Sequence, residues 1–134
     1  LFTCRCKPAN TFGVGEMSIL HEMDGGEIAL SIDIDQGARI ASLNFRGIEC
    51  VVPFRGEVLT WGWYAMGPWA GRIRDGLVRD AKGNSYQLPT NFTPPHAIHG
   101  FTLTGSWQEI GAGHFAIDFP KPYLGARMEQ RFEI

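Results

Sequence analysis

The sequence predicts an all-β fold, with residues 1–134 forming a single antiparallel β-sandwich domain. Three observations lead to this prediction. Short stretches alternate apolar and polar residues with a period of two, which is typical of strands that bury one face. The chain contains 17 glycines and 8 prolines, which push it toward many short strands joined by turns. No long segment carries the 3.6-residue apolar period of an amphipathic helix.

The first half of the chain indicates an antiparallel meander with one apolar face. Leu1 to Gly15 has no clean period and suggests a tail or an edge strand, and 16–20 suggests a short strand. After a turn at Asp24-Gly25-Gly26, residues 27–35 alternate well, and two further strands follow around the Arg46-Gly47 turn until Pro53 ends the pairing. The apolar faces expected of these strands are Ile28, Leu30, Ile32 and Ile34, then Ala41, Leu43 and Phe45, then Ile48, Cys50 and Val52.

The second half predicts a hairpin and three more strands. Residues 77–88 place apolar ends around a polar, glycine-containing turn, which is a hairpin signature. A strand is expected from Phe101 to Ile110 around Trp107, and another over 114–119. Residues 127–134 alternate sharply and stop without a turn signal, so we expect an exposed ladder edge there and self-association through it.

The composition restricts the class of protein. An apolar content of 44% and a charged content of 19% are those of a globular chain. The net charge of −2 gives no reason to expect a nucleic-acid partner. No apolar run approaches the ~20 residues needed to cross a bilayer, and no signal-peptide pattern is visible. Three cysteines argue against a secreted disulfide framework, with Cys4 and Cys6 expected to be reduced thiols. We therefore expect a cytoplasmic protein without a membrane partner.

The stretch from Pro68 to Gly100 carries the candidate chemistry. It places Arg72, His96 and His99 on loops rich in glycine, proline and tryptophan, and loops on a rigid scaffold are where binding groups concentrate. The hairpin between them is expected to fold Arg72 and His99 back toward each other.

This stretch resembles the aldose 1-epimerase (galactose mutarotase) family. Members carry a P-W-x-N-R-I-x-D-G segment, a G-x-x-Y-x-L hairpin and an N…H-x-L-H-G loop, and this chain matches them in order and spacing, with Gly71 where many members have Asn. Residues 37–43 also look like the family's first strand pair. The resemblance implies the N-terminal portion of a supersandwich fold that is incomplete here. The matching positions are Pro68-Trp69, Arg72-Ile73, Asp75-Gly76, Gly83, Tyr86, Leu88, Asn91 and His99-Gly100.

The resemblance also implies an activity. Family members are isomerases that interconvert the α and β anomers of free aldohexoses such as galactose and glucose by acid/base ring opening, without a cofactor. The family's sugar-binding arginine and histidine, which act near the ring oxygen, correspond to Arg72 and His99, and His99 is the catalytic candidate. The family's acid histidine and base glutamate have no counterpart: His114 lies in G-H-F-A, and Glu129 and Glu133 lie on a solvent face.

The remaining candidates each have a plainer alternative. Trp69 is a candidate platform for a sugar ring or a core residue. His96 is a candidate pocket-rim residue or part of a turn, and Asn91 contacts sugar or caps the turn before Pro94. The His96/His99 spacing suits a metal, but no third ligand is near, so none is expected.

Two other functions stay open for the chain. It is alternatively a non-catalytic carbohydrate-binding module that lacks the acid and the base. The other alternative is a sugar-phosphate mutarotase of the same fold, with Arg74 as an added anion contact.

Overall fold

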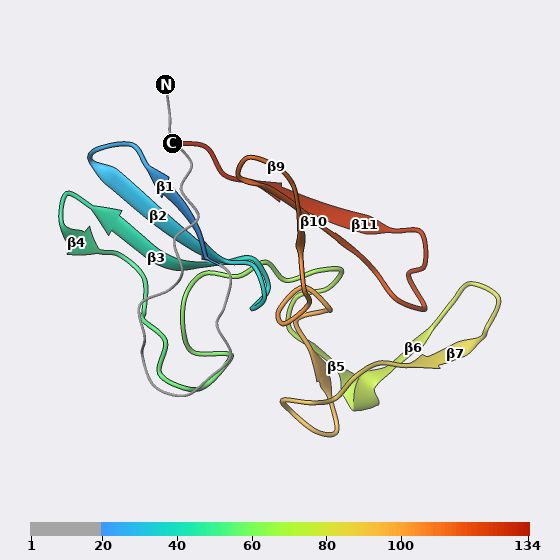
Figure 1. Cartoon of the computed structure of the whole chain (residues 1–134). Coiled ribbons are helices and arrows are strands. Elements are labelled where there is room, and N and C mark those ends of the chain that lie inside the picture. The colour runs from blue at the N-terminus through green and yellow to red at the C-terminus, as the bar shows by residue number, and fades with distance from the viewer. Residues whose placement is uncertain (1–19) are drawn as a thin grey trace.

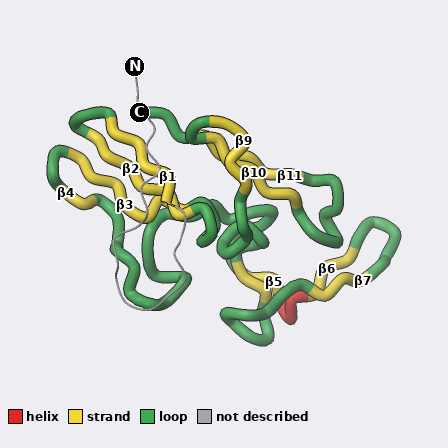
Figure 2. The backbone as a smooth tube through the Cα atoms, in the orientation of Figure 1, coloured by secondary structure: helices red, strands yellow, loops and turns green. Residues whose placement is uncertain are grey.

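The computed structural model describes residues 20–134, so the expectations for the first nineteen residues lie outside it. Two antiparallel sheets form a β-sandwich, which confirms the predicted fold class (Figures 1 and 2). The first sheet has the order β1-β2-β3-β4 and the second the order β11-β10-β9. Their strands are β1 (Leu20–Asp24), β2 (Ile28–Asp33), β3 (Arg39–Phe45) and β4 (Ile48–Glu49), then β9 (Gln108–Gly111), β10 (His114–Asp118) and β11 (Arg127–Arg131).

The core lies between the two sheets. The apolar face predicted for the second strand is the face that packs inward, with Leu30, Ile32 and Ile34 buried against Trp107 and Phe115. The Gln130 amide donates a hydrogen bond of 2.7 Å to the Ala38 carbonyl oxygen, which joins β11 to the start of β3. Burial of these side chains is the main favourable contribution to the packing of the sheets.

A β-bulge changes the face that β3 presents to the core. The register shifts between Ser31 and Ile32, so that Leu30 lies opposite Leu43 while Ile32 lies opposite Ile40. The predicted inward set of Ala41, Leu43 and Phe45 is therefore only partly correct: Leu43 packs on the core together with Ile40, and Phe45 is exposed. A bulge adds one residue to one strand, which moves the alternation to the other phase.

A third region lies beyond the ends of the two sheets (Figure 1). It contains the predicted hairpin of residues 77–88, in which Leu77 lies opposite Gln87, and a short pair made by the residues on either side of that hairpin. The elements are β5 (Arg72–Ile73), the 3₁₀ turn η1 (Arg74–Gly76), β6 (Leu77–Arg79), β7 (Ser85–Gln87) and β8 (Ala97–Ile98).

The strand expected from Phe101 to Ile110 begins only at Gln108. Before it, the Phe101 N–H donates to the Gly67 carbonyl oxygen (2.7 Å), and the Trp107 indole N–H donates to the Thr102 carbonyl oxygen (3.2 Å). Backbone groups used in these bonds are withdrawn from a sheet ladder, so residues 101–104 form turns. No helix within 20–134 has the length and apolarity that crossing a membrane requires.

Candidate functional site

The predicted approach of Arg72 and His99 is present in the structure. The strands β5 and β8 are antiparallel neighbours, and Arg72 lies opposite Ile98, the residue before His99. Two hydrogen bonds close the pair: the His99 N–H donates to the Gly71 carbonyl oxygen (3.0 Å), and the Gly71 N–H donates to His99 Nδ1 (3.1 Å). The imidazole is thereby held beside the start of β5.

The bond at Nδ1 determines the proton position on His99. Because Nδ1 accepts from Gly71, a neutral ring carries its proton on Nε2 and offers it as a donor. Burial lowers the pKa of His99, and the positive charge of Arg72 lowers it further. Both effects favour a neutral imidazole next to a permanent cation at neutral pH. Such a pair can donate several hydrogen bonds to an oxygen-rich ligand.

Arg72 is exposed, and within residues 20–134 its guanidinium takes part in no ion pair. A guanidinium presents five N–H donors in a planar fork and stays charged at physiological pH. Arg72 is therefore suited to bind neighbouring oxygens of a ligand, since no carboxylate of the described residues engages it.

A buried arginine, Arg39, contacts the segments around the site, and the sequence analysis did not single it out. Its side chain is completely buried, and it donates to four backbone carbonyl oxygens, those of Gln36 (2.8 Å), Val58 (3.0 Å), Trp61 (3.0 Å) and Leu103 (3.2 Å). Burial lowers the pKa of Arg39, while the charges of Tyr64 and Asp33 act in the opposite direction. These bonds tie the loop after β4 to the sandwich.

The same arginine connects the sandwich to His99 through aromatic rings. Its guanidinium carbon lies 4.2 Å from the Trp61 ring centre and 4.9 Å from that of Tyr64. On its other side, the Tyr64 ring lies 6.1 Å from the His99 ring. Arg39 thus contacts Tyr64, and Tyr64 lies between the guanidinium and the imidazole of His99 in this chain of contacts.

A close approach of Gly67 and Gly100 fixes the position of the loop that carries His99. Gly67 and Gly100 form a parallel bridge, and a Cβ atom on Gly100, whose φ is +75°, would overlap the Gly67 carbonyl oxygen. The buried Thr102 hydroxyl accepts from the Gly67 N–H (2.8 Å) and donates to the Ala65 carbonyl oxygen (2.6 Å). Only glycine fits at position 100, which explains the Gly that follows His99 in the sequence.

Trp69 lies in an aromatic cluster. Its ring meets Phe101 edge-on at 5.3 Å and lies 6.2 Å from Tyr123. Trp69 is half-buried, and its indole nitrogen is buried without a hydrogen-bond partner in the described part of the chain. This packing is that of a core residue. Because Trp69 is only half-buried, its role as a platform for a sugar ring stays a prediction.

His96 braces the turn that follows β5. Its Nδ1 accepts from the Asp75 N–H (3.1 Å), and its own N–H donates to the Thr93 carbonyl oxygen (2.8 Å). The Asp75 carboxylate lies 4.0 Å from the same Nδ1. These contacts account for His96 as part of a turn. Nδ1 of His96 and Nδ1 of His99 thus each accept from a backbone N–H. No cluster of metal-ligating side chains occurs within residues 20–134.

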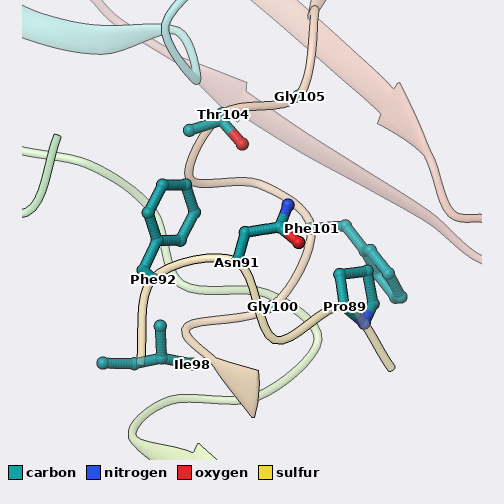
Figure 3. Close-up of a pocket in the computed structure, with 8 residues that line it drawn as sticks. All are labelled: Pro89, Asn91, Phe92, Ile98, Gly100, Phe101, Thr104 and Gly105. Atoms are coloured by element: carbon teal, nitrogen blue, oxygen red, sulfur yellow. The ribbon is translucent and has the colours of Figure 1, made fainter. Parts of the chain in front are cut away.

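Asn91 is exposed and lines a separate pocket of about 120 Å³, shown in Figure 3. Arg72 and His99 are not among its lining residues, so Asn91 is not grouped with them. The pocket shares the His99 loop through Gly100, and its walls are Pro89, Asn91, Phe92, Ile98, Gly100, Phe101, Thr104 and Gly105.

Comparison with solved structures identifies the fold. The chain resembles a putative aldose 1-epimerase from Escherichia coli K12, with a TM-score of 0.67 and 21% identity over 86% of this chain and 41% of that one. It also resembles a galactose mutarotase-like protein from Clostridium acetobutylicum, with a TM-score of 0.60 and 18% identity over 90% of this chain and 40% of that one. A galactose 1-epimerase from Lactobacillus acidophilus NCFM gives a TM-score of 0.53 at 18% identity, covering 90% and 40%. The resemblance in fold predicted from the sequence is confirmed.

Sequence comparison reaches a shorter segment. No family model matches the chain. A stretch of 75 residues is 36% identical to the uncharacterized protein YihR of Escherichia coli K12, which is 54% of this chain and 24% of that protein. The chain spans about 40% of the length of the solved structures that it resembles.

Proposed function

We propose that this chain is the sugar-binding part of a mutarotase-like isomerase, in which Arg72 and His99 hold a free aldohexose such as galactose or glucose. The observation that carries the proposal is the closed β5–β8 pair, in which Arg72 lies opposite the residue before His99 and the Gly71 N–H donates to His99 Nδ1. The charge of Arg72 also lowers the pKa of His99. A hexose offers its ring oxygen and the neighbouring hydroxyl oxygens at the spacing of one guanidinium fork.

The chemistry that this pair supplies is orientation and polarisation. Opening the sugar ring requires a proton at the ring oxygen and removal of the proton from the anomeric hydroxyl. Hydrogen bonds from Arg72 and from His99 Nε2 to the ring oxygen stabilise the negative charge that develops there as the C1–O5 bond breaks. A positioned proton donor contributes roughly 10²–10⁴-fold to such a reaction.

The contacts of the late glutamates favour a second candidate, a carbohydrate-binding module without catalysis. Glu129 is paired with His114 at 3.1 Å and with Arg127 at 3.2 Å, and Glu133 is paired with Arg131 at 2.7 Å. These carboxylates lie on or next to β11, in the second sheet, whereas Arg72 and His99 lie in the third region (Figure 1). The family's base glutamate is thus not supplied to the pair by β11.

Calorimetry and polarimetry on one sample test both candidates. We expect saturable binding of galactose or glucose that is lost in Arg72→Ala and retained in the control Arg79→Ala, an exposed arginine on the hairpin. Absence of binding, or equal binding by both variants, contradicts the proposal.

The polarimetric arm separates the isomerase from the binding module. Relaxation of α-galactose above the buffer rate, abolished by His99→Ala, supports the isomerase, whereas binding without rate enhancement supports the module. A parallel titration with glucose 6-phosphate tests the sugar-phosphate alternative, since Arg74 next to Arg72 then adds affinity.

A further inference from the structure

The pocket that Asn91 lines is a second candidate binding site (Figure 3). It has a volume of about 120 Å³, and the residues that line it are all uncharged. They include two aromatic residues, Phe92 and Phe101, and two residues with polar side chains, Asn91 and Thr104. A charged ligand would lose hydration in this pocket without gaining an opposite charge, so the lining selects a neutral ligand.

One wall of the pocket is fixed by close backbone contacts. Gly100 forms a bridge with Gly67, and the Phe101 N–H donates to the Gly67 carbonyl oxygen (2.7 Å). The Phe101 ring meets the Trp69 ring edge-on at 5.3 Å. Gly105 lies so close to this segment that a Cβ atom on it would be 2.7 Å from the Phe101 carbonyl oxygen. The wall is therefore formed before a ligand arrives, which reduces the ordering that binding requires.

The other wall is a loop that is anchored at both ends. Before Asn91, the N–H of the buried Leu88 donates to the Gly76 carbonyl oxygen (2.7 Å). After it, the His96 N–H donates to the Thr93 carbonyl oxygen (2.8 Å), and the Thr93 hydroxyl donates to the His96 carbonyl oxygen (3.2 Å). These bonds hold the segment that carries Asn91 in place against the first wall.

The two polar side chains of the pocket are available to a ligand. Within residues 20–134, neither the Asn91 amide nor the Thr104 hydroxyl has a hydrogen-bond partner in the chain. In Figure 3 the Asn91 amide lies between the rings of Phe92 and Phe101. An amide and a hydroxyl both donate and accept, as the hydroxyl groups of a sugar do. The faces of the aromatic rings carry partial negative charge, which attracts the weakly positive C–H groups of a sugar ring.

We propose that this pocket binds one neutral sugar ring, with its C–H groups against Phe92 and Phe101 and its hydroxyl groups bonded to Asn91 and Thr104. The volume suits a single ring, because sites for drug-sized ligands measure roughly 300–1,000 Å³. The sugar-binding role proposed for Arg72 is not a premise of this inference, since that residue does not line the pocket.

Nuclear magnetic resonance of the isotope-labelled chain tests the pocket directly, with methyl β-galactopyranoside as the ligand. This glycoside cannot open its ring, so binding is measured without mutarotation. We expect saturable shifts of the Asn91 side-chain amide and of the Gly100 and Gly105 N–H groups, with a Kd in the millimolar range. The same shifts remain in Arg72→Ala, which removes the other candidate site, so the two proposals fail or succeed separately.

Two variants test the polar contacts of the pocket. Asn91→Leu keeps a similar volume and removes the amide, and we expect it to weaken binding about tenfold; Thr104→Val removes the hydroxyl and weakens binding about three- to tenfold. The control Asn84→Leu changes an exposed amide in the hairpin turn, outside the pocket, and binds as the wild type does. Circular dichroism confirms that each variant is folded, and if one pocket variant fails to fold, the other decides.

Three results would overturn the proposal. The first is the absence of shifts at these groups up to about 100 mM glycoside. The second is a set of shifts that the folded pocket variants retain in full or that Arg72→Ala abolishes, because binding then takes place elsewhere. The third is a pocket that responds to cyclohexanol but not to the glycoside, because such a pocket accepts an apolar ring rather than a sugar.

Discussion

Replacing the buried Arg39 with methionine is expected to destabilise the fold strongly. Methionine fills much of the same volume but donates no hydrogen bond, so the carbonyl oxygens of Gln36, Val58, Trp61 and Leu103 lose their donor. Each buried acceptor left unsatisfied costs about 1–3 kcal/mol. Recovery of the arginine's desolvation energy and entry of water offset part of this cost, so we expect a loss of at least about 3 kcal/mol in the free energy of unfolding.

Urea unfolding followed by tryptophan fluorescence measures this loss. The matched control is Arg46→Met, since Arg46 is exposed, pairs with Glu27 at 2.9 Å and lies 5.2 Å from the Phe45 ring centre. An exposed ion pair contributes about 0–1 kcal/mol, so the control remains close to wild type. The reasoning is refuted if Arg39→Met and Arg46→Met unfold within about 1 kcal/mol of each other, because the four carbonyl bonds then add nothing measurable.

Two further predictions concern the loops of the site. NMR titration should give His99 a pKa below its ordinary 6.5, and Arg72→Met should raise that pKa because one of its two causes is removed. With a lowered pKa in the folded state, His99 binds a proton more readily in the unfolded chain, so it lowers the free energy of unfolding as the pH falls below about 6.5. A measured pKa of His99 at or above 6.5 contradicts the prediction. Gly100→Ala should lose more than about 3 kcal/mol of stability in a thermal or urea melt, since the new Cβ meets the Gly67 carbonyl and the positive φ adds strain. The control Gly83→Ala has the same sign of φ (+84°) with nothing within 4 Å, so only the strain of about 1–2 kcal/mol applies, and equal losses in the two variants would disprove the role of the close approach.

Features that depend on residues close together in the sequence were predictable from it. The alternation of residues 28–32, the turn at Asp24 and the 77–88 hairpin all appear in the structure where the pattern places them. The alternation ends there, because Asp33 is buried between Ile32 and Ile34. The hairpin also brings Arg72 and His99 together, because pairing two strands on either side of it leaves the flanking residues adjacent. The roles of these two residues in sugar binding, and those of Trp69, His96 and Asn91, stay predictions.

The parts that were missed depend on contacts between distant segments. The bulge at Ser31/Ile32 exchanges Ala41 for Ile40 on the core face, and no feature of the strand itself announces it. The turns at 101–104 replace the expected strand because Gly67 takes the Phe101 N–H. Periodicity describes how one segment faces the core, but it carries no information on which remote carbonyl captures a given donor.

Local alternation and turn residues by themselves determined that this chain is an antiparallel sandwich with Arg72 and His99 on adjoining loops. Only the tertiary structure decided that Arg39 is buried beside the site and that Nδ1 of His99 accepts from the Gly71 N–H. The physical reason is that the buried guanidinium bonds to four carbonyl oxygens from three segments, those of Gln36, of Val58 and Trp61, and of Leu103. Those partners come together only when the sheets pack, so their arrangement is a property of the folded chain.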